Sequence, residues 1–68
     1  MDFSERLREL RAERKETQVQ VAEAVGMTPR QYQGLEGATS APNFRNLCAL
    51  ADHFGVSLDY LAGRTDKR

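Results

Sequence analysis

The stretch TQVQVAEAVGMTPRQYQGLE, residues 17–36, decides the fold. Thr17 and Thr28 each precede a glutamine by three residues, which is the spacing of a capping box at a helix N-terminus. Pro29 follows the second threonine at the first helical position, where no N–H donor is needed. Gly26 lies between the two segments and suits the left-handed backbone conformation that ends a helix. The stretch therefore predicts two short helices joined by a tight turn.

Seven positions in this stretch have the properties that a sharp helix crossing requires. Ala22 is small enough for two backbones to approach closely, and Gly26 can adopt a positive φ without strain. The other five are apolar side chains that can fix the crossing angle: Val21, Val25, Met27, Tyr32 and Leu35. We expect Tyr32 to pack in the core, with its hydroxyl directed to water or to a polar partner.

The flanking sequence predicts three more helices and no strand, because its apolar residues recur at helical spacing between capping residues. The first of these helices is expected to begin after the N-cap Asp2 and to end near residues 14–16. The other two are expected to begin after the N-caps Asn43 and Ser57 and to end at Gly55 and Gly63. The predicted fold class is therefore all-α, a compact five-helix bundle in residues 1–63 with the two-helix motif at 17–36. Residues 64–68 form a polar C-terminal tail that we expect to be solvated or frayed.

Length and composition limit the functions that the chain can have. A chain of 68 residues forms one small domain, and the single Cys48 excludes an internal disulfide and fits a reducing, cytoplasmic setting. Cys48 and His53 do not share a helix face, so we expect a small core residue and a polar surface residue with an ordinary pH response. No cofactor, metal, small-molecule ligand or membrane span is expected. The sequence offers no nucleophile with an oriented base, which argues against an enzyme.

The motif and its flanks, LRELRAER before it and LCALADHFGVSLDYLAG after it, resemble the helix-turn-helix family of lambda repressor, Cro and Xre-like regulators. The resemblance covers about residues 3–63. It implies a sequence-specific, double-stranded DNA-binding transcriptional regulator, a repressor encoded by a bacterium or phage, whose third helix lies in the major groove. Charge gives no support, because ten basic and ten acidic side chains cancel, whereas DNA-binding domains usually carry a basic surplus.

The resemblance also assigns residues to the DNA. The outward positions of the third helix are expected to contact base edges: Thr28, Pro29, Arg30, Gln33 and Gly34. Arg30 is suited to pair with guanine and Gln33 with adenine. Gly34 leaves the middle of this helix without a side chain, so either the backbone approaches the DNA closely or the groove is not read there. Phosphate contacts are expected from Gln18, Thr39, Ser40, Asn43 and Arg45.

Arg11 and Glu36 match a family ion pair that joins the first helix to the end of the third. The other charges of the first helix, at residues 5–16, are expected to form a solvated face, with a phosphate contact from Arg14 or Lys15 as an open alternative. Two positions depart from the family pattern. Glu16 replaces the apolar residue that usually precedes the cap, and Ala38 replaces the glycine that often ends the third helix.

The family binds near-palindromic operators as dimers, which implies that this chain is a homodimer. The expected dimer surface consists of Val56, Leu58, Tyr60 and Leu61. One alternative function stays open at this point. The same fold could be a protein-interaction domain, antitoxin-like for example, with weak or no DNA binding, and the zero net charge and Gly34 favour this alternative.

Overall fold

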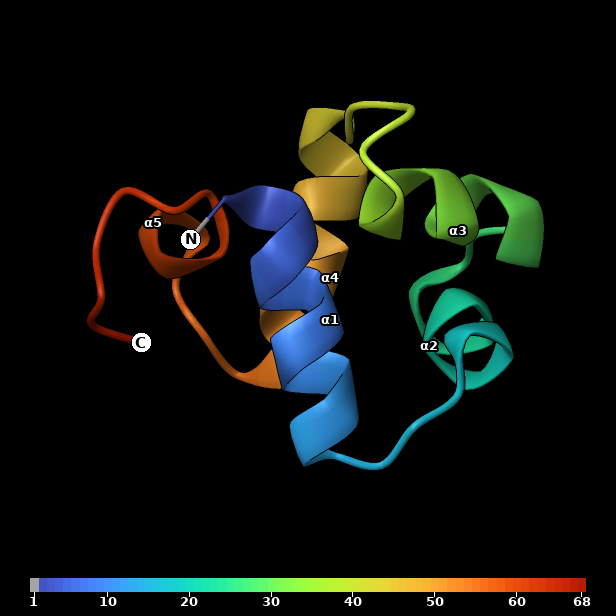
Figure 1. Ribbon diagram of the computed structural model, residues 1–68, viewed down its shortest axis with the longest axis horizontal. Helices are drawn as coiled ribbons and strands as arrows, with labels where there is room; N and C mark the ends of the chain where they lie inside the picture. The colour runs from blue at the N-terminus through green and yellow to red at the C-terminus, as the bar shows by residue number, and fades with distance from the viewer. Residues whose placement is uncertain (1) are drawn as a thin grey trace.

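The computed structural model describes residues 2–68, and within them it contains five helices and no strand (Figure 1). The helices are α1 (Phe3–Glu13), α2 (Gln18–Val25), α3 (Pro29–Glu36), α4 (Phe44–Phe54) and α5 (Leu58–Leu61). The predicted all-α fold class is therefore confirmed. The first helix ends one residue before the expected range, because Arg14 is its C-cap.

All five helices begin at the predicted capping residues: Asp2, Thr17, Thr28, Asn43 and Ser57. Each of these side chains accepts a hydrogen bond from a backbone N–H three residues on, and the first three complete a capping box. A cap of this kind stabilises a helix by about 1 kcal/mol. That contribution matters here, because α2 and α3 have only eight residues each and α5 has four.

Left-handed residues end α2 and α4 at the predicted glycines, where Gly26 has φ 77° and Gly55 has φ 66°. The end of α3 differs. Gly37 has φ −87°, and the left-handed conformation falls on Ala38, with φ 59°. An alanine there is strained by about 1–2 kcal/mol, because its Cβ approaches the following carbonyl. The departure from the family pattern at Ala38 therefore leaves a strained residue at the start of the loop that follows α3.

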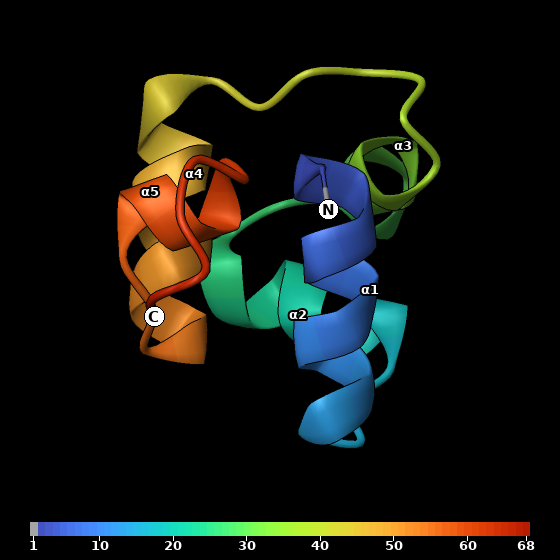
Figure 2. The ribbon, with the colours of Figure 1, turned by 60° about the vertical axis from the view of Figure 1, so that its left-hand side comes forward.

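The helices are arranged around α1 (Figure 1). In that view α2 and α3 lie on one side of α1, and α5 with the C-terminal tail lies on the other. The fourth helix contacts both α2 and α5, and the loop after α3 passes over the top of the molecule to reach it (Figure 2). Among residues 2–68, no helix combines the length and the apolar character needed to cross a lipid bilayer.

The core draws one fully buried large side chain from each helix: Leu7, Val21, Tyr32, Leu50 and Leu61. The predicted core position of Tyr32 is confirmed, since its side chain is 0% exposed. Its hydroxyl does not reach water, however, and has no hydrogen-bond partner among the described residues. Five helices thus share a single core, which fixes α2 and α3 relative to the rest of the bundle.

Arg6 is buried, and the expectation that it belongs to a solvated face is wrong. Its side chain is 4% exposed, and its guanidinium donates to the backbone oxygens of Tyr60, at 2.8 Å, and Thr65, at 2.6 Å. It also pairs with the Asp66 carboxylate at 2.8 Å and lies 4.0 Å from the centre of the Tyr60 ring. The sequence held a signal for this position, because Arg6 is three residues after Phe3 and falls on the inward stripe of α1.

The C-terminal tail is exposed but not frayed, which corrects the sequence-based expectation. Besides its contacts with Arg6, its last residue, Arg68, donates to the Glu13 carboxylate at 2.9 Å. The backbone oxygen of Arg68 accepts from Ser57 N at 2.8 Å. The tail therefore folds over α5 (Figure 2), and side-chain contacts join it to α1.

We expect Arg6→Met to lower the free energy of unfolding by about 2 kcal/mol, because two backbone oxygens lose a charged donor while the apolar stem is kept. Asp66→Ala should lower it by less than about 1 kcal/mol, because the Asp66 side chain is 99% exposed and its ion pair is screened by water. Urea unfolding followed by circular dichroism measures both. Equal losses in the two variants would contradict a role for Arg6 through the backbone oxygens.

Candidate nucleic-acid interface

The crossing of α2 and α3 forms as the seven-position pattern predicts. Ala22 is fully buried where the helices approach, and Val21 and Leu35 pack beside it in the same core. The turn is closed by Met27 N, which donates to the Ala22 backbone oxygen at 2.8 Å. Met27 itself is buried, so the turn contributes to the core as well as to the change of direction. This geometry holds α3 at the surface with its outward face free.

Four of the five residues expected to contact bases lie exposed along α3 and its N-cap: Thr28, Pro29, Arg30 and Gln33. The Thr28 hydroxyl already accepts from Gln31 N at 3.1 Å. Arg30 and Gln33 make no side-chain hydrogen bond or ion pair within residues 2–68, so their donors remain available to a ligand. The structure thus brings together one bidentate cation and one bidentate amide on one exposed face.

Gly34 differs from these four, because the loop after α3 covers it. Its backbone oxygen accepts from Thr39 N at 3.0 Å, from Ser40 N at 3.3 Å and from Thr39 Oγ1 at 3.3 Å. A Cβ added to Gly34 would lie 2.6 Å from Ser40 Oγ, far inside van der Waals contact. Glycine at this position leaves room for the Ser40 hydroxyl. The two expected alternatives, a close approach of DNA or an unread groove, stay predictions.

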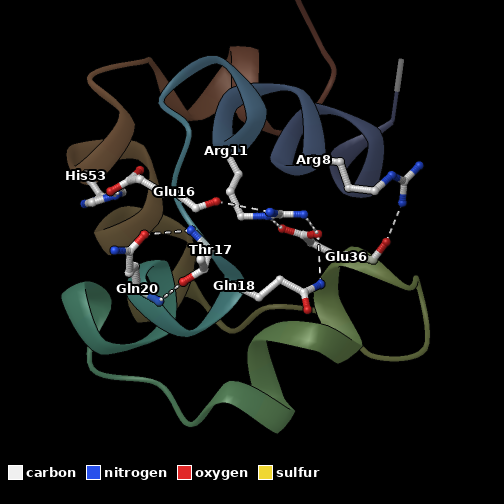
Figure 3. Close-up of polar contacts among 8 residues, drawn as sticks. All are labelled: Arg8, Arg11, Glu16, Thr17, Gln18, Gln20, Glu36 and His53. Carbon is white, nitrogen blue, oxygen red and sulfur yellow. Dashed lines mark hydrogen bonds and ion pairs between the residues drawn. The ribbon is translucent and has the colours of Figure 1, made fainter.

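The predicted ion pair between Arg11 and Glu36 is present and joins three helices (Figure 3). Arg11 Nε and Nη2 contact the two carboxylate oxygens of Glu36 at 2.6 and 3.0 Å. Gln18 Nε2, from the first turn of α2, donates to the same carboxylate at 3.1 Å. Arg8 donates to the Glu36 backbone oxygen, so a second arginine of α1 holds the C-terminal end of α3. The cluster fixes the ends of α1, α2 and α3 against one another.

Electrostatics favour the ionised form of this cluster. Burial opposes ionisation of Glu36, which is 3% exposed, but hydrogen bonds from Arg11 and Gln18 outweigh it and hold the pKa of Glu36 below its ordinary value. The hydrogen bond to Glu36 raises the pKa of Arg11. Burial, and then the neighbouring Glu36 carboxylate, raise the pKa of the Tyr32 phenol. The pair therefore stays charged over the whole neutral range.

The residues expected to contact phosphate lie at three places. Gln18 is half-buried, because its amide faces Glu36, and one N–H of that amide remains for an outside partner. Thr39 and Ser40 are exposed on the loop after α3. Asn43 Oδ1 accepts from Asn46 N at 2.7 Å as the cap of α4, which leaves the amide N–H groups of Asn43 free.

The first turn of α4 adds two exposed side chains of different kinds. Arg45 is exposed and has no acidic partner within the described residues. Phe44 is 73% exposed, which its position in the sequence did not predict. Its spacing of three from Leu47 makes it look like part of the buried stripe of α4, so only the structure separates it from the core.

Two of the charges at the end of α1, those of Arg14 and Glu16, are engaged within the protein. The Glu16 carboxylate lies 3.0 Å from His53 Nε2, and Arg14 Nη1 donates to the His53 backbone oxygen at 2.9 Å (Figure 3 shows the Glu16 pair). The prediction that His53 is a plain surface residue is therefore wrong. The unusual acid at residue 16 has a local reason, because it joins the turn before α2 to the end of α4. Cys48 is half-buried on the same helix.

Two of the four expected dimer residues have no surface to offer. Leu61 is fully buried and Tyr60 is 6% exposed, both within the core of the same chain. Val56 and Leu58 are only partly buried where they pack against that core. The expected dimer surface is thus reduced to these two side chains.

No group of three or more histidine, cysteine or acidic side chains within residues 2–68 is placed to hold a metal ion.

Comparison with known sequences agrees with this geometry. The sequence pattern of the helix-turn-helix family matches residues 7–61, which include all five helices in part or in full. The chain belongs to this helix-turn-helix family. The match extends well beyond the motif at 17–36, so the flanking helices are part of the family likeness too.

Two curated helix-turn-helix relatives are regulators by name. The uncharacterized HTH-type transcriptional regulator YobD of Bacillus subtilis is 39% identical over 64 residues, which cover 94% of this chain and 57% of that protein. The cryptic phage CTXphi transcriptional repressor RstR of Vibrio cholerae is 34% identical, with the same coverage. The chain therefore spans about half the length of the curated relatives it matches.

Solved helix-turn-helix structures share the whole fold. The P22 c2 repressor, solved in complex with synthetic operator 9T, superimposes with a TM-score of 0.90 and 29% identity, over 96% of this chain and 98% of that chain. A transcriptional regulator from Listeria innocua gives a TM-score of 0.87 and 27% identity, over 98% of this chain and 63% of that one.

We expect Glu36→Gln to lower the free energy of unfolding by about 2 kcal/mol near neutral pH, because Arg11 loses its buried counter-charge. The pKa of Glu36 lies below its ordinary value of 4.5 in the folded chain, so its contribution is present above that pH and is lost as the pH falls through the folded pKa. Denaturant unfolding at a series of pH values should therefore show a flatter acid decline in Glu36→Gln. Glu23→Gln removes an exposed acid and should keep the wild-type slope. Matching slopes in all three proteins would contradict the assignment.

Proposed function

We propose that this chain is a sequence-specific, double-stranded DNA-binding domain of a transcriptional regulator, and that the regulator is a repressor. The third helix lies in the major groove, where Arg30 contacts guanine and Gln33 contacts adenine, with Thr28 and Pro29 against the same base edges. The domain acts by binding rather than by catalysis, without a cofactor, in the cytoplasm of a bacterium or a phage-infected cell.

One observation carries this proposal. The outward face of α3 presents unengaged Arg30 and Gln33 on a fold that superimposes, over nearly its whole length, on a repressor solved with its operator. The identity of 29% over that length supports a common mode of binding as well as a common fold. We place the phosphates at the start of α2 and around the loop after α3, on Gln18, Thr39, Asn43 and Arg45.

The distribution of charge supports a weak electrostatic component. Most arginines of the chain contact acidic groups or backbone oxygens. Arg30 on α3 and Arg45 at the start of α4 have no such contact within the described residues. Each neutralised phosphate contributes about −0.9 to the slope of log affinity against log salt. Arg30 is assigned to guanine, so Arg45 is the one arginine of the two that is assigned to a phosphate. The slope should therefore be about −1 per domain, and nonspecific DNA should be held weakly.

Arg30→Ala is the test of this function. We expect it to remove about 1–3 kcal/mol of discrimination at one base pair, because a bidentate contact to guanine is lost. Fluorescence anisotropy measures the affinity for duplexes that the wild-type chain selects from a random pool. The same duplexes with single base pairs substituted give the discrimination at each position. Arg64→Ala removes the same charge from a side chain that is 78% exposed beyond α5, and should leave affinity and preference unchanged.

No binding of any duplex by the wild-type chain at low salt would contradict DNA recognition and favour a protein partner. Equal losses on all duplexes in Arg30→Ala would place Arg30 on a phosphate instead of a base.

We also infer that the domain binds a near-palindromic operator as a homodimer, because one domain supplies one major-groove helix and specificity needs two half-sites. Val56 and Leu58 are the expected contacts between protomers, since they alone of the four predicted residues keep exposed surface. Sedimentation equilibrium with a selected duplex should show two chains per duplex, and Val56→Asp should reduce this to one at the same concentration. A single chain per duplex in the wild type would contradict the homodimer.

A further inference from the structure

We propose that Ser40 supplies the side chain that α3 lacks at Gly34, and that its hydroxyl contacts a base edge one helical turn beyond Arg30. The sequence suggested a phosphate contact for Ser40, and this proposal replaces it. It rests on the proposed DNA-binding function and names a further specificity-determining residue of the same surface, together with the glycine that positions it.

Gly34 lies on the outward face of α3, one helical turn after Arg30. Residues four apart lie on one face of a helix, so Gly34 follows Arg30 along the outward face, opposite the buried Tyr32 and Leu35. A side chain at this position would project from the same face as the Arg30 guanidinium. Glycine removes it, and a glycine inside a helix is less favourable than alanine by about 1 kcal/mol. A compensating use of the space is therefore expected.

The loop fills that space with a hydroxyl. Ser40 Oγ lies 2.6 Å from the point where a Cβ of residue 34 would be, and Ser40 Cβ lies 3.6 Å from it. Three donors from Thr39 and Ser40 converge on the backbone oxygen of Gly34, which fixes the loop against the helix. The Ser40 side chain therefore occupies the place of the missing side chain while belonging to another segment.

The Ser40 hydroxyl is available for a ligand. Ser40 is exposed, and its hydroxyl makes no hydrogen bond with another group of residues 2–68. The hydrogen bonds that hold the loop come from the backbone of Ser40 and from Thr39, which leaves the Ser40 hydroxyl free to donate and accept. A serine hydroxyl can pair with either a donor or an acceptor on a base edge. Gly34 acts as a positioning residue, because any Cβ there would displace the hydroxyl.

Three variants test the proposal against duplexes selected by the wild-type chain: Ser40→Ala, Gly34→Ala and the double variant. We expect Ser40→Ala to lose preference at one base pair next to the pair read by Arg30, by about five-fold, the effect of one hydrogen bond. Gly34→Ala should lose the same preference, because its methyl group turns the hydroxyl away. The double variant should be no worse than either single one, because Ser40 Oγ is the atom in conflict and alanine at 40 removes it.

Two controls separate this result from misfolding and from phosphate binding. Thermal unfolding of Gly34→Ala should be no lower than that of the wild type, since alanine favours the helix. Arg45→Ala removes a cation assigned to a phosphate, leaves the hydrogen bonds of the loop intact and should weaken all duplexes alike. The proposal is overturned if Ser40→Ala weakens every duplex by one factor, or if Gly34→Ala keeps the wild-type preference. Failure of the wild-type chain to bind any duplex overturns the proposed function first, and this proposal with it.

Discussion

The contact between Arg11 and Glu36 fixes the geometry on which the rest of the exposed surface depends. Glu36 is the last residue of α3, Arg11 belongs to α1, and Gln18 brings the first turn of α2 to the same carboxylate. A carboxylate this deeply buried is stable as an anion only with several donors around it. The cluster therefore sets the angle of α3 and the start of α2 together, and those are the two places proposed to meet bases and phosphates.

The domain uses most of its charge for its own structure, which explains why its composition gives no hint of a polyanionic partner. Arg6 holds the tail, Arg8 and Arg11 hold the end of α3, and Arg14 holds the end of α4. Each of these cations donates to an acid or a backbone oxygen of the same chain. The proposed recognition of DNA is then left to two arginines and a set of neutral amides and hydroxyls, which favours specificity over general attraction to DNA.

Much of the fold could be predicted because it depends on local chemistry. The caps at Thr17, Thr28 and Asn43 are determined by a side chain and a backbone N–H three residues away, and all three formed as expected. The contacts of Arg6 and His53 could not be predicted in this way. Arg6 contacts Tyr60 and Thr65, and His53 contacts Glu16, so the partners lie 37 to 59 residues apart in the sequence. The alternation of charges along α1 is also the same whether a side chain faces water or another helix.

The candidate site, like the fold, has features that depend on local spacing and features that depend on distant contacts. The exposed positions of Arg30 and Gln33 could be predicted from helical periodicity, which depends only on spacing along α3. The contacts of Gly34 with Thr39 and Ser40 could not be predicted in this way, because they depend on how the loop after α3 folds back on the helix. Tyr60 and Leu61 were assigned to a surface although they belong to the core. A four-residue helix is too short to show which of its sides faces inward.

The path of the C-terminal tail has a practical consequence for labelling the protein. Arg68 ends beside Ser57, on the side of α1 away from α3, because its backbone oxygen bonds to Ser57 N (Figure 1). A fluorophore or affinity tag joined after residue 68 would start far from the outward face of α3 and leave it clear. The same tag would start next to Val56 and Leu58, so a bulky one would crowd the proposed pairing between two copies. A small tag on a flexible spacer suits this end of the chain.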